Sequence, residues 1–157
     1  MRYSNIILMN IYLAADHGGF NLKNQLLVFL KELGYTPVDC GNTALDEEDD
    51  YPDFIAELAR KMLVDPESLG VVLCRNGVGV SIAANRYVHL RSTLGLNAEH
   101  VKKARTDDNI NVLALAADYF SLEEIKPLVN AFLNTPFSNL ERHNRRLAKI
   151  NELAKTA

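Results

Sequence analysis

Short apolar runs recur along the chain, and each is followed by a turn and a segment with helical periodicity. The runs Asn10–Ala15 and Leu69–Leu73 have the composition of strands buried inside a parallel sheet. Between them, leucines recur from Leu22 to Leu33 at the three- and four-residue spacing of a helix. Strands that alternate with helices in this way are joined by right-handed crossovers, so the sheet is parallel and carries helices on both faces. The sequence therefore predicts one α/β domain.

The other predicted elements continue this alternation. The predicted strands are Asn10–Ala15, Tyr35–Asp39, Leu69–Leu73, Ser92–Leu96 and Val112–Leu115. The predicted helices lie at Leu22–Leu33, at Tyr51–Met62, around Ser81–Asn85, from about Asn97 to Arg105, from Ser121 to about Asn134 and over roughly Asn139–Lys155. Gly34 is expected at a helix C-terminus and Asp50 as an N-cap, while Ser121 and Glu124 have the spacing of a capping box.

Length, charge and cysteine content limit the class of protein. A chain of 157 residues suits one domain, and a net charge of -3 argues against a general nucleic-acid binder, which needs basic residues to displace counterions. Two cysteines, Cys40 and Cys74, are too few for a disulfide scaffold and fit a reducing compartment. The run Ile6–Met9 is a poor signal peptide, and no apolar stretch is long enough to span a bilayer. We therefore expect a cytoplasmic protein that binds neither nucleic acid nor membranes.

Ligands in open α/β sheets bind beyond the carboxyl ends of the strands. Three clusters are expected to converge there, namely the turn Asp16–Gly19, the turn Cys74–Gly79 and the segment before Val112. Glycines in the second turn allow backbone N–H groups to approach an anion at a helix N-terminus. A dinucleotide site is disfavoured, because the third glycine of that fingerprint is missing and the turn follows the third strand.

Several residues near these turns have two interpretations. Cys74 is either an inert buried side chain or a thiolate at a helix N-terminus, and His17 is either a turn residue or a functional group. The acidic segment 46–50 is interpreted as a solvated loop, with a metal site as the lesser alternative. Arg142 and Arg146 share one helix face, either as a solvated surface that pairs with this loop or as a bidentate phosphate clamp.

Four segments resemble the type B ribose-5-phosphate isomerase and galactose-6-phosphate isomerase family. They are Asp16-His17-Gly18-Gly19-Phe20-Asn21-Leu22-Lys23, Asp50-Tyr51-Pro52, Cys74 with Gly77–Arg86, and Arg142-His143 with Arg146. The resemblance runs from about Met9 to the last helix, so residues 1–8 are expected to be an N-terminal extension and residues 9–157 the isomerase domain. It implies a Rossmann-like three-layer α/β/α domain with a five-stranded parallel sheet.

The resemblance also implies a chemistry and an assembly. In the family, the cysteine that matches Cys74 moves a proton between C1 and C2 of a phosphorylated sugar through a cis-enediolate. The residue two positions on, here Asn76, assists it, and backbone amides of the loop Gly77, Val78 and Gly79 hold the developing oxyanion. No metal or organic cofactor takes part. A homodimer or dimer of dimers is implied, with the C-terminal helix at the interface and the active site shared between subunits.

The remaining roles concern binding of the sugar phosphate. By the same resemblance, Asp16 binds substrate hydroxyl groups, and His17, Arg142 and Arg146 bind the phosphate. These assignments give a carboxylate for the sugar and three cationic or potentially cationic groups for the dianion.

The chain departs from the family pattern at two places. Arg75 and Asn76 stand where the family has a glycine and a small hydroxyl residue, and Arg75 adds bulk and charge to the substrate pocket. Asp107 and Asp108 replace the His-Asn pair before the fifth strand, whose histidine opens the sugar ring; His100 is a weaker substitute for that histidine. Either Asp107 takes over the acid–base role, or the two carboxylates repel a phosphorylated sugar or select a different one. A further alternative is that the chain is a catalytically reduced binding protein or one subunit of a mixed oligomer.

Overall fold

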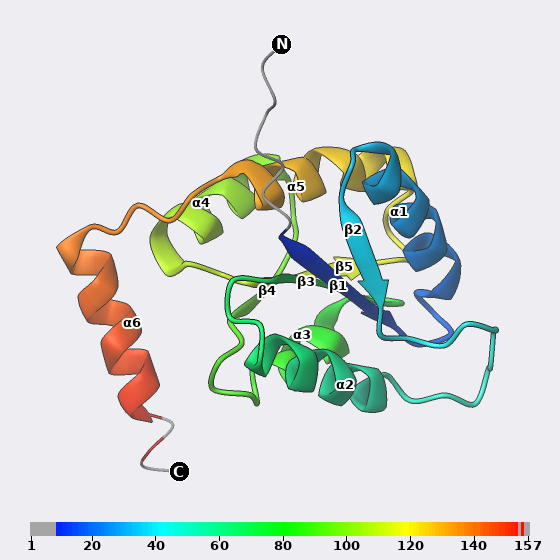
Figure 1. Ribbon diagram of the computed structural model, residues 1–157, viewed down its shortest axis with the longest axis horizontal. Coiled ribbons are helices and arrows are strands. Elements are labelled where there is room, and N and C mark those ends of the chain that lie inside the picture. Colours follow the sequence, from blue (N-terminus) through cyan, green and yellow to red (C-terminus); the bar gives the residue numbers. More distant parts are fainter. Residues whose placement is uncertain (1–8, 154, 156–157) are drawn as a thin grey trace.

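The computed structural model describes residues 9–153 and 155 and contains a five-stranded, all-parallel sheet in the order β2-β1-β3-β5-β4 (Figure 1). The expected N-terminal extension, residues 1–8, lies outside the described residues. The strands are β1 Asn10–Ala15, β2 Thr36–Asp39, β3 Leu69–Cys74, β4 Ser92–Leu94 and β5 Val112–Ala116. The helices are α1 Phe20–Glu32, α2 Tyr51–Leu63, α3 Val78–Ala84, α4 Ala98–Asp108, α5 Leu122–Asn134 and α6 Glu141–Leu153.

Helices cover both faces of the sheet, with α1, α4 and α5 on one face and α2 and α3 on the other (Figure 1). Successive strand residues point to opposite faces. In β1, Ile11 and Leu13 therefore enter the core under α1 and α5, whereas Tyr12 and Ala14 face the core under α2. The predicted Rossmann-like three-layer α/β/α architecture is confirmed.

The predicted element order is also confirmed, with small differences at the ends. β4 stops at Leu94, two residues earlier than predicted, because the chain then turns toward α4, where the side chain of Asn97 accepts a hydrogen bond from the N–H of His100. The capping box of Ser121 and Glu124 is present. Asp50 is the N-cap of α2, but its side chain makes no capping hydrogen bond.

The helix α6 stands apart from the rest of the domain (Figure 1). His143 is its buried residue, and the helix contacts the body mainly through α4. Among the residues described, no helix combines the length and the apolar character that crossing a bilayer requires.

Candidate active site

The turn after β1 holds Asp16 in a fixed orientation. The residue is 7% exposed, and its Oδ1 accepts hydrogen bonds from the N–H groups of Gly18 at 3.0 Å and Gly19 at 3.3 Å. These bonds engage one carboxylate oxygen only. Oδ2 takes no part in these two bonds.

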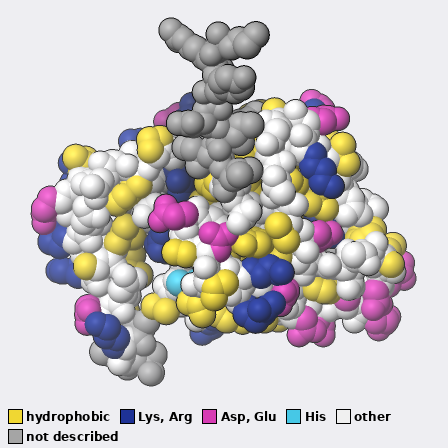
Figure 2. Space-filling view, in the orientation of Figure 1, with side chains coloured by type: hydrophobic (Ala, Val, Ile, Leu, Met, Phe, Trp, Pro, Cys, Tyr) yellow, Lys and Arg dark blue, Asp and Glu magenta, His cyan; other side chains and the backbone are white. Residues whose placement is uncertain are grey.

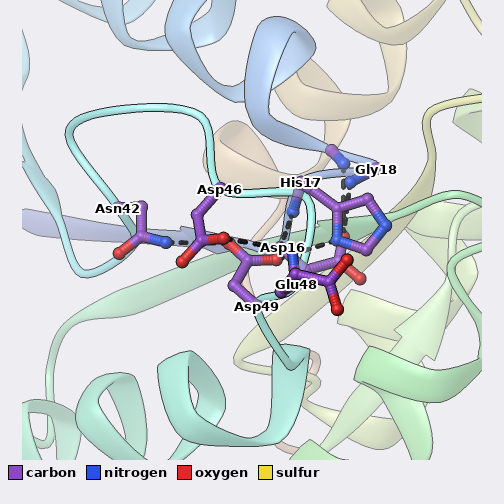
Figure 3. Close-up of polar contacts among 8 residues, drawn as sticks. Asp16, His17, Gly18, Asn42, Asp46, Glu48 and Asp49 are labelled. Atoms are coloured by element: carbon purple, nitrogen blue, oxygen red, sulfur yellow. Dashed lines mark hydrogen bonds and ion pairs between the residues drawn. The ribbon is translucent and has the colours of Figure 1, made fainter.

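His17 contacts the acidic loop rather than solvent alone (Figure 3). Its backbone N–H donates to Oδ1 of Asp49 at 2.8 Å, and its Nδ1 lies 2.9 Å from the same oxygen. The hydrogen bond with Asp49 raises the pKa of His17, and the charges of Asp16 and Asp49 add to this effect while desolvation opposes it. The interpretation of residues 46–50 as a solvated loop is therefore wrong for Asp49, whose side chain is 6% exposed.

The turn after β3 surrounds the sulfur of Cys74 with polar groups. The N–H of Gly77 donates to Sγ at 3.2 Å, and Oδ1 of Asn76 lies 3.8 Å from it. The same Oδ1 accepts from the N–H of Val78 at 3.0 Å, so the amide of Asn76 is oriented with Nδ2 left for another acceptor. Gly77 has a left-handed φ of 73°, a conformation that glycine adopts at little cost.

The two turns lie against each other at the carboxyl end of the sheet. A methyl group added at Gly18 would lie 2.5 Å from Cγ of Arg75, and one added at Gly19 would lie 2.7 Å from Cβ of Leu73. The Arg75 side chain thus crosses the His17 turn, and its guanidinium lies 3.7 Å from the carboxylate of Asp118. The structure brings together two of the three clusters that the sequence predicts.

The third cluster lies at the opposite end of the sheet. In the pairing of β3 with β5, Gly70 is opposite Val112 and Cys74 is opposite Ala116. The four-residue rise from Val112 to Ala116 spans roughly 13 Å. Asp107 and Asp108 end α4 just before Val112, so they lie beside the amino ends of the strands. The expectation that the segment before Val112 converges with the other two turns is therefore wrong within one protomer.

The basic cluster of α6 lies near Asp107. His143 is 3% exposed: its Nδ1 lies 2.7 Å from Oγ of Ser138, and its Nε2 accepts a hydrogen bond from Nε of Arg142 at 3.2 Å. Nε2 also lies 3.9 Å from Oδ1 of Asp107. Arg145 pairs with Glu141 of its own helix. Figure 1 shows α6 across the molecule from loop 40–50, so this helix face does not pair with the acidic loop within one protomer.

Two grooves separate α6 from the body of the domain. One, of about 720 Å³, is lined by Asp107, Asp108, Leu147 and Ile150 among others. The other, of about 830 Å³, lies beside the first and extends to Met62 and neighbouring residues. Figure 2 shows hydrophobic side chains along this gap. Neither groove is lined by Cys74 or His17. The sulfur lies at the carboxyl end of β3, whereas α6 with its arginine cluster contacts Asp107 near the amino end of β5, so one protomer presents them on separate surfaces.

Comparison with known protein families identifies the family of the chain. The profile of the Ribose/Galactose Isomerase family matches residues 11–150. The chain belongs to this family.

Relatives that bear the ribose-5-phosphate isomerase B name match this chain over most of its length. Ribose-5-phosphate isomerase B of Mycobacterium leprae is 38% identical over 148 residues, which are 94% of this chain and 91% of that protein. The probable ribose-5-phosphate isomerase B of Mycoplasma pneumoniae is 38% identical over 140 residues, covering 89% and 91%.

Solved structures of ribose/galactose isomerases agree with the fold. Ribose-5-phosphate isomerase B of Mycoplasma genitalium, crystallised with bound ribulose-5-phosphate, has a TM-score of 0.89 and 35% identity over 95% of this chain and 98% of that one. The type B enzyme of Trypanosoma cruzi has a TM-score of 0.89 and 30% identity over 96% and 99%.

Sequence patterns alone missed two residues of this family member's site. Asp49 and its partner Asn42, whose Nδ2 donates to Oδ2 of Asp49 at 2.8 Å, support His17 from a loop. The only signal was the acidic segment itself, and its composition suggested solvation. Within the described residues no three His, Cys, Asp or Glu side chains are grouped so as to hold a metal ion.

Proposed function

We propose that this family member interconverts ribose 5-phosphate and ribulose 5-phosphate. Relatives named ribose-5-phosphate isomerase B support the reaction, and none supports a binding protein without catalysis. The observation that carries the proposal is the sulfur of Cys74, which lies at the carboxyl end of β3 within 3.2 Å of the Gly77 N–H and beside the Asp16 turn. A proton acceptor, an N–H donor and a hydroxyl-binding carboxylate are the groups that an enediolate reaction requires.

The proposed reaction moves one proton between adjacent carbons. The Cys74 thiolate removes the proton from C2 of the open-chain aldose, and the electron pair forms the C1–C2 double bond of a cis-enediolate. The C1 carbonyl oxygen thereby becomes the oxyanion, and the hydroxyl proton on O2 passes to O1. Cys74 then returns its proton to C1 as the C2 oxygen becomes the carbonyl and the C1 oxygen remains a hydroxyl group. Oδ2 of Asp16 accepts a hydrogen bond from a substrate hydroxyl and holds the sugar in register with the sulfur.

The oxyanion needs donors that the turn does not use internally. The N–H groups of Gly77 and Val78 already donate to Cys74 and Asn76. We therefore assign the oxyanion to Nδ2 of Asn76 and to the N–H of Gly79, since an amide in the first turn of a helix has no intrahelical acceptor. Gly77 and Val78 thus act by orienting the sulfur and the Asn76 amide.

The phosphate site is proposed to be completed by a second copy of the chain. His17 lies on the Cys74 surface, whereas Arg142 and Arg146 lie on α6 at the other end of the sheet, so the three cannot meet in one protomer. A homodimer in which α6 of each copy packs on the other would bring them together. Exposed apolar residues on α6 and near the grooves support this contact, with Ile150 52% exposed and Val88 61% exposed.

The departures from the family pattern receive roles in the same proposal. Asp107, from the second copy, acts as the acid–base group for ring opening, and Asp108 lies beside it at the rim of the pocket. Arg75 borders the sugar side of the pocket, where its ion pair with Asp118 limits the length of the substrate. A cytoplasmic location fits the reduced state of the two cysteines.

A panel of aldose phosphates tests the proposal. Purified protein is incubated with the 5-phosphates of ribose and arabinose and the 6-phosphates of allose and galactose, and ketose formation is followed by NMR. In D2O, deuterium should appear at C1 of the ketose when the thiol exchanges with solvent during the transfer. Turnover of ribose 5-phosphate supports the proposal, whereas binding without turnover of any member would overturn it.

A further inference from the structure

We propose that Asp49 is a positioning residue that fixes one tautomer and one orientation of the His17 ring, with Nε2–H directed at the phosphate of the substrate. The inference rests on the proposed function, because it concerns the phosphate side of the same site. It gives a role to a loop residue that neither sequence composition nor the family resemblance marks as part of that site.

The hydrogen bonds of Asp49 restrain both the backbone and the ring of His17 (Figure 3). A single oxygen, Oδ1, lies 2.8 Å from the backbone nitrogen and 2.9 Å from Nδ1 of His17. An ionised carboxylate only accepts hydrogen bonds, so Nδ1 carries the proton in this pair. Nε2 is then the ring nitrogen left for a ligand, and the side chain of His17 is 26% exposed, which allows access from solvent.

Asp49 is itself held in place from behind. Nδ2 of Asn42 donates to Oδ2 of Asp49 at 2.8 Å, and the carbonyl of Asn42 accepts from Nζ of Lys23 at 3.0 Å. Lys23 is fully buried on α1 and also pairs with Asp39 at the end of β2. A chain of contacts therefore connects the core to His17 through the loop. Burying the ammonium group of Lys23 is costly unless it is paired, so its contacts with Asp39 and Asn42 hold the loop against the core.

Asp49 differs from the other acidic residues of the loop. The side chains of Asp46, Glu47, Glu48 and Asp50 belong to exposed residues, whereas that of Asp49 is 6% exposed. Oδ1 of Asp46 accepts a local hydrogen bond from the N–H of Glu48 at 3.1 Å. Asp46 therefore provides a matched control, because its removal changes the loop charge equally without touching His17.

The contact also favours the cationic form of His17. The charged groups that face the ring are Asp49 from the loop and Asp16 from its own turn, and the hydrogen bond with Asp49 is the largest cause of the raised pKa of His17. A raised pKa means that the ring keeps its charge, and the folded state keeps this stabilisation, until the pH rises through the folded-state pKa. A cation with Nε2–H toward a phosphate dianion donates a charge-assisted hydrogen bond.

The first test measures the ring directly by NMR. Asn at position 49 can still accept both bonds through its Oδ1 but carries no charge, and the Asn42 amide can flip to match it. In the wild-type protein and in Asp46→Asn, the long-range nitrogen spectrum of His17 should show protonated Nδ1 at high pH, and the His17 pKa should be above the ordinary histidine value. In Asp49→Asn the pKa should fall, and in Asp49→Ala the preference for the Nδ1–H tautomer should also be lost. The histidine resonance that disappears in the His17→Gln variant is that of His17, which distinguishes it from the other three histidines.

The second test separates positioning from general structure. Inorganic phosphate should shift the His17 resonance of the wild type, with its affinity weakened about three- to tenfold in Asp49→Asn and unchanged in Asp46→Asn. With ribose 5-phosphate, Asp49→Asn should raise KM at neutral pH with little change in kcat, and the KM difference should narrow as the pH is lowered. An unchanged His17 pKa and tautomer in Asp49→Ala would overturn the inference even if the enzyme is active. Conversely, an NMR result as expected without turnover would overturn the proposed reaction alone.

Discussion

The sulfur of Cys74 lies 3.2 Å from the backbone nitrogen of Gly77, which donates a hydrogen bond to it. The left-handed φ of Gly77 aims this N–H back at the strand end, and the helix α3 begins at the next residue. An N–H group directed at sulfur interacts more strongly with a negative thiolate than with a neutral thiol. The backbone of the turn is thus shaped around the group that moves the proton in the proposed reaction.

Cys74→Ala should remove catalysis without unfolding the protein. Loss of a positioned general base lowers kcat by about 10²- to 10⁴-fold. Cys40→Ala is the matched control, because Cys40 is equally buried and burial raises its pKa to about 12, which keeps it a neutral thiol. Steady-state kinetics and circular dichroism check both variants. Retained turnover in Cys74→Ala would show that another group carries the proton.

Gly77→Ala should damage both stability and activity. The new methyl group would lie 2.5 Å from Cδ1 of Leu94 and 3.0 Å from the backbone carbon of Leu115, and the positive φ would be strained. We expect a loss of about 2–4 kcal/mol in the free energy of unfolding, together with a lower kcat.

Gly34→Ala measures the cost of a positive φ without the steric clash that accompanies it at Gly77. Gly34 has a φ of +87°, but its added methyl group would meet nothing within 4 Å. Its loss of stability should be about 1 kcal/mol, with kcat unchanged. Denaturant unfolding and steady-state kinetics measure both effects. Equal losses in the two variants would show that the packing around Gly77 does not matter.

The fold follows from local patterns, whereas part of the site does not. Hydrophobic periodicity and turn residues are enough to locate the strands and most helix ends. Residues that are close in sequence share one buried face of a strand or helix, so the pattern can be seen within a short window. The position of Asp107 follows from the direction of α4 in the fold. This helix runs antiparallel to the strands, so its last residues lie at the amino end of β5. The pairing of Asp49 with His17 joins residues 32 positions apart, and no local pattern marks such a contact.

Asp107→Asn tests the proposed ring-opening role. Ribose 5-phosphate must open its furanose ring before isomerisation, whereas ribulose 5-phosphate has no furanose ring to open. The kcat for ribose 5-phosphate should therefore fall by about tenfold or more, with a smaller loss from the ketose side. Asp107→His should restore the rate. Equal losses in both directions, or no rescue by histidine, would contradict the role assigned to Asp107.

Mixing two inactive variants tests whether two copies share one site. Arg146→Ala removes a phosphate-binding group on α6, and Cys74→Ala removes the base at the other end of the sheet. In a dimer that contains one of each, one site has both substitutions and the other has none. After denaturation and refolding of an equal mixture, half of the dimers are mixed, so about a quarter of the wild-type activity should return.

Activity can return only if Cys74 of one copy meets Arg146 of the other. Within one protomer they are apart, because Cys74 lies at the carboxyl end of β3 while α6 packs near the amino ends of the strands. Arg145→Ala is the control on the same helix, since Arg145 pairs with Glu141 and should remain active alone. Each variant refolded separately gives the background rate. If the mixture stays at that background although sedimentation shows mixed dimers, the arginine cluster and the sulfur do not belong to one shared site.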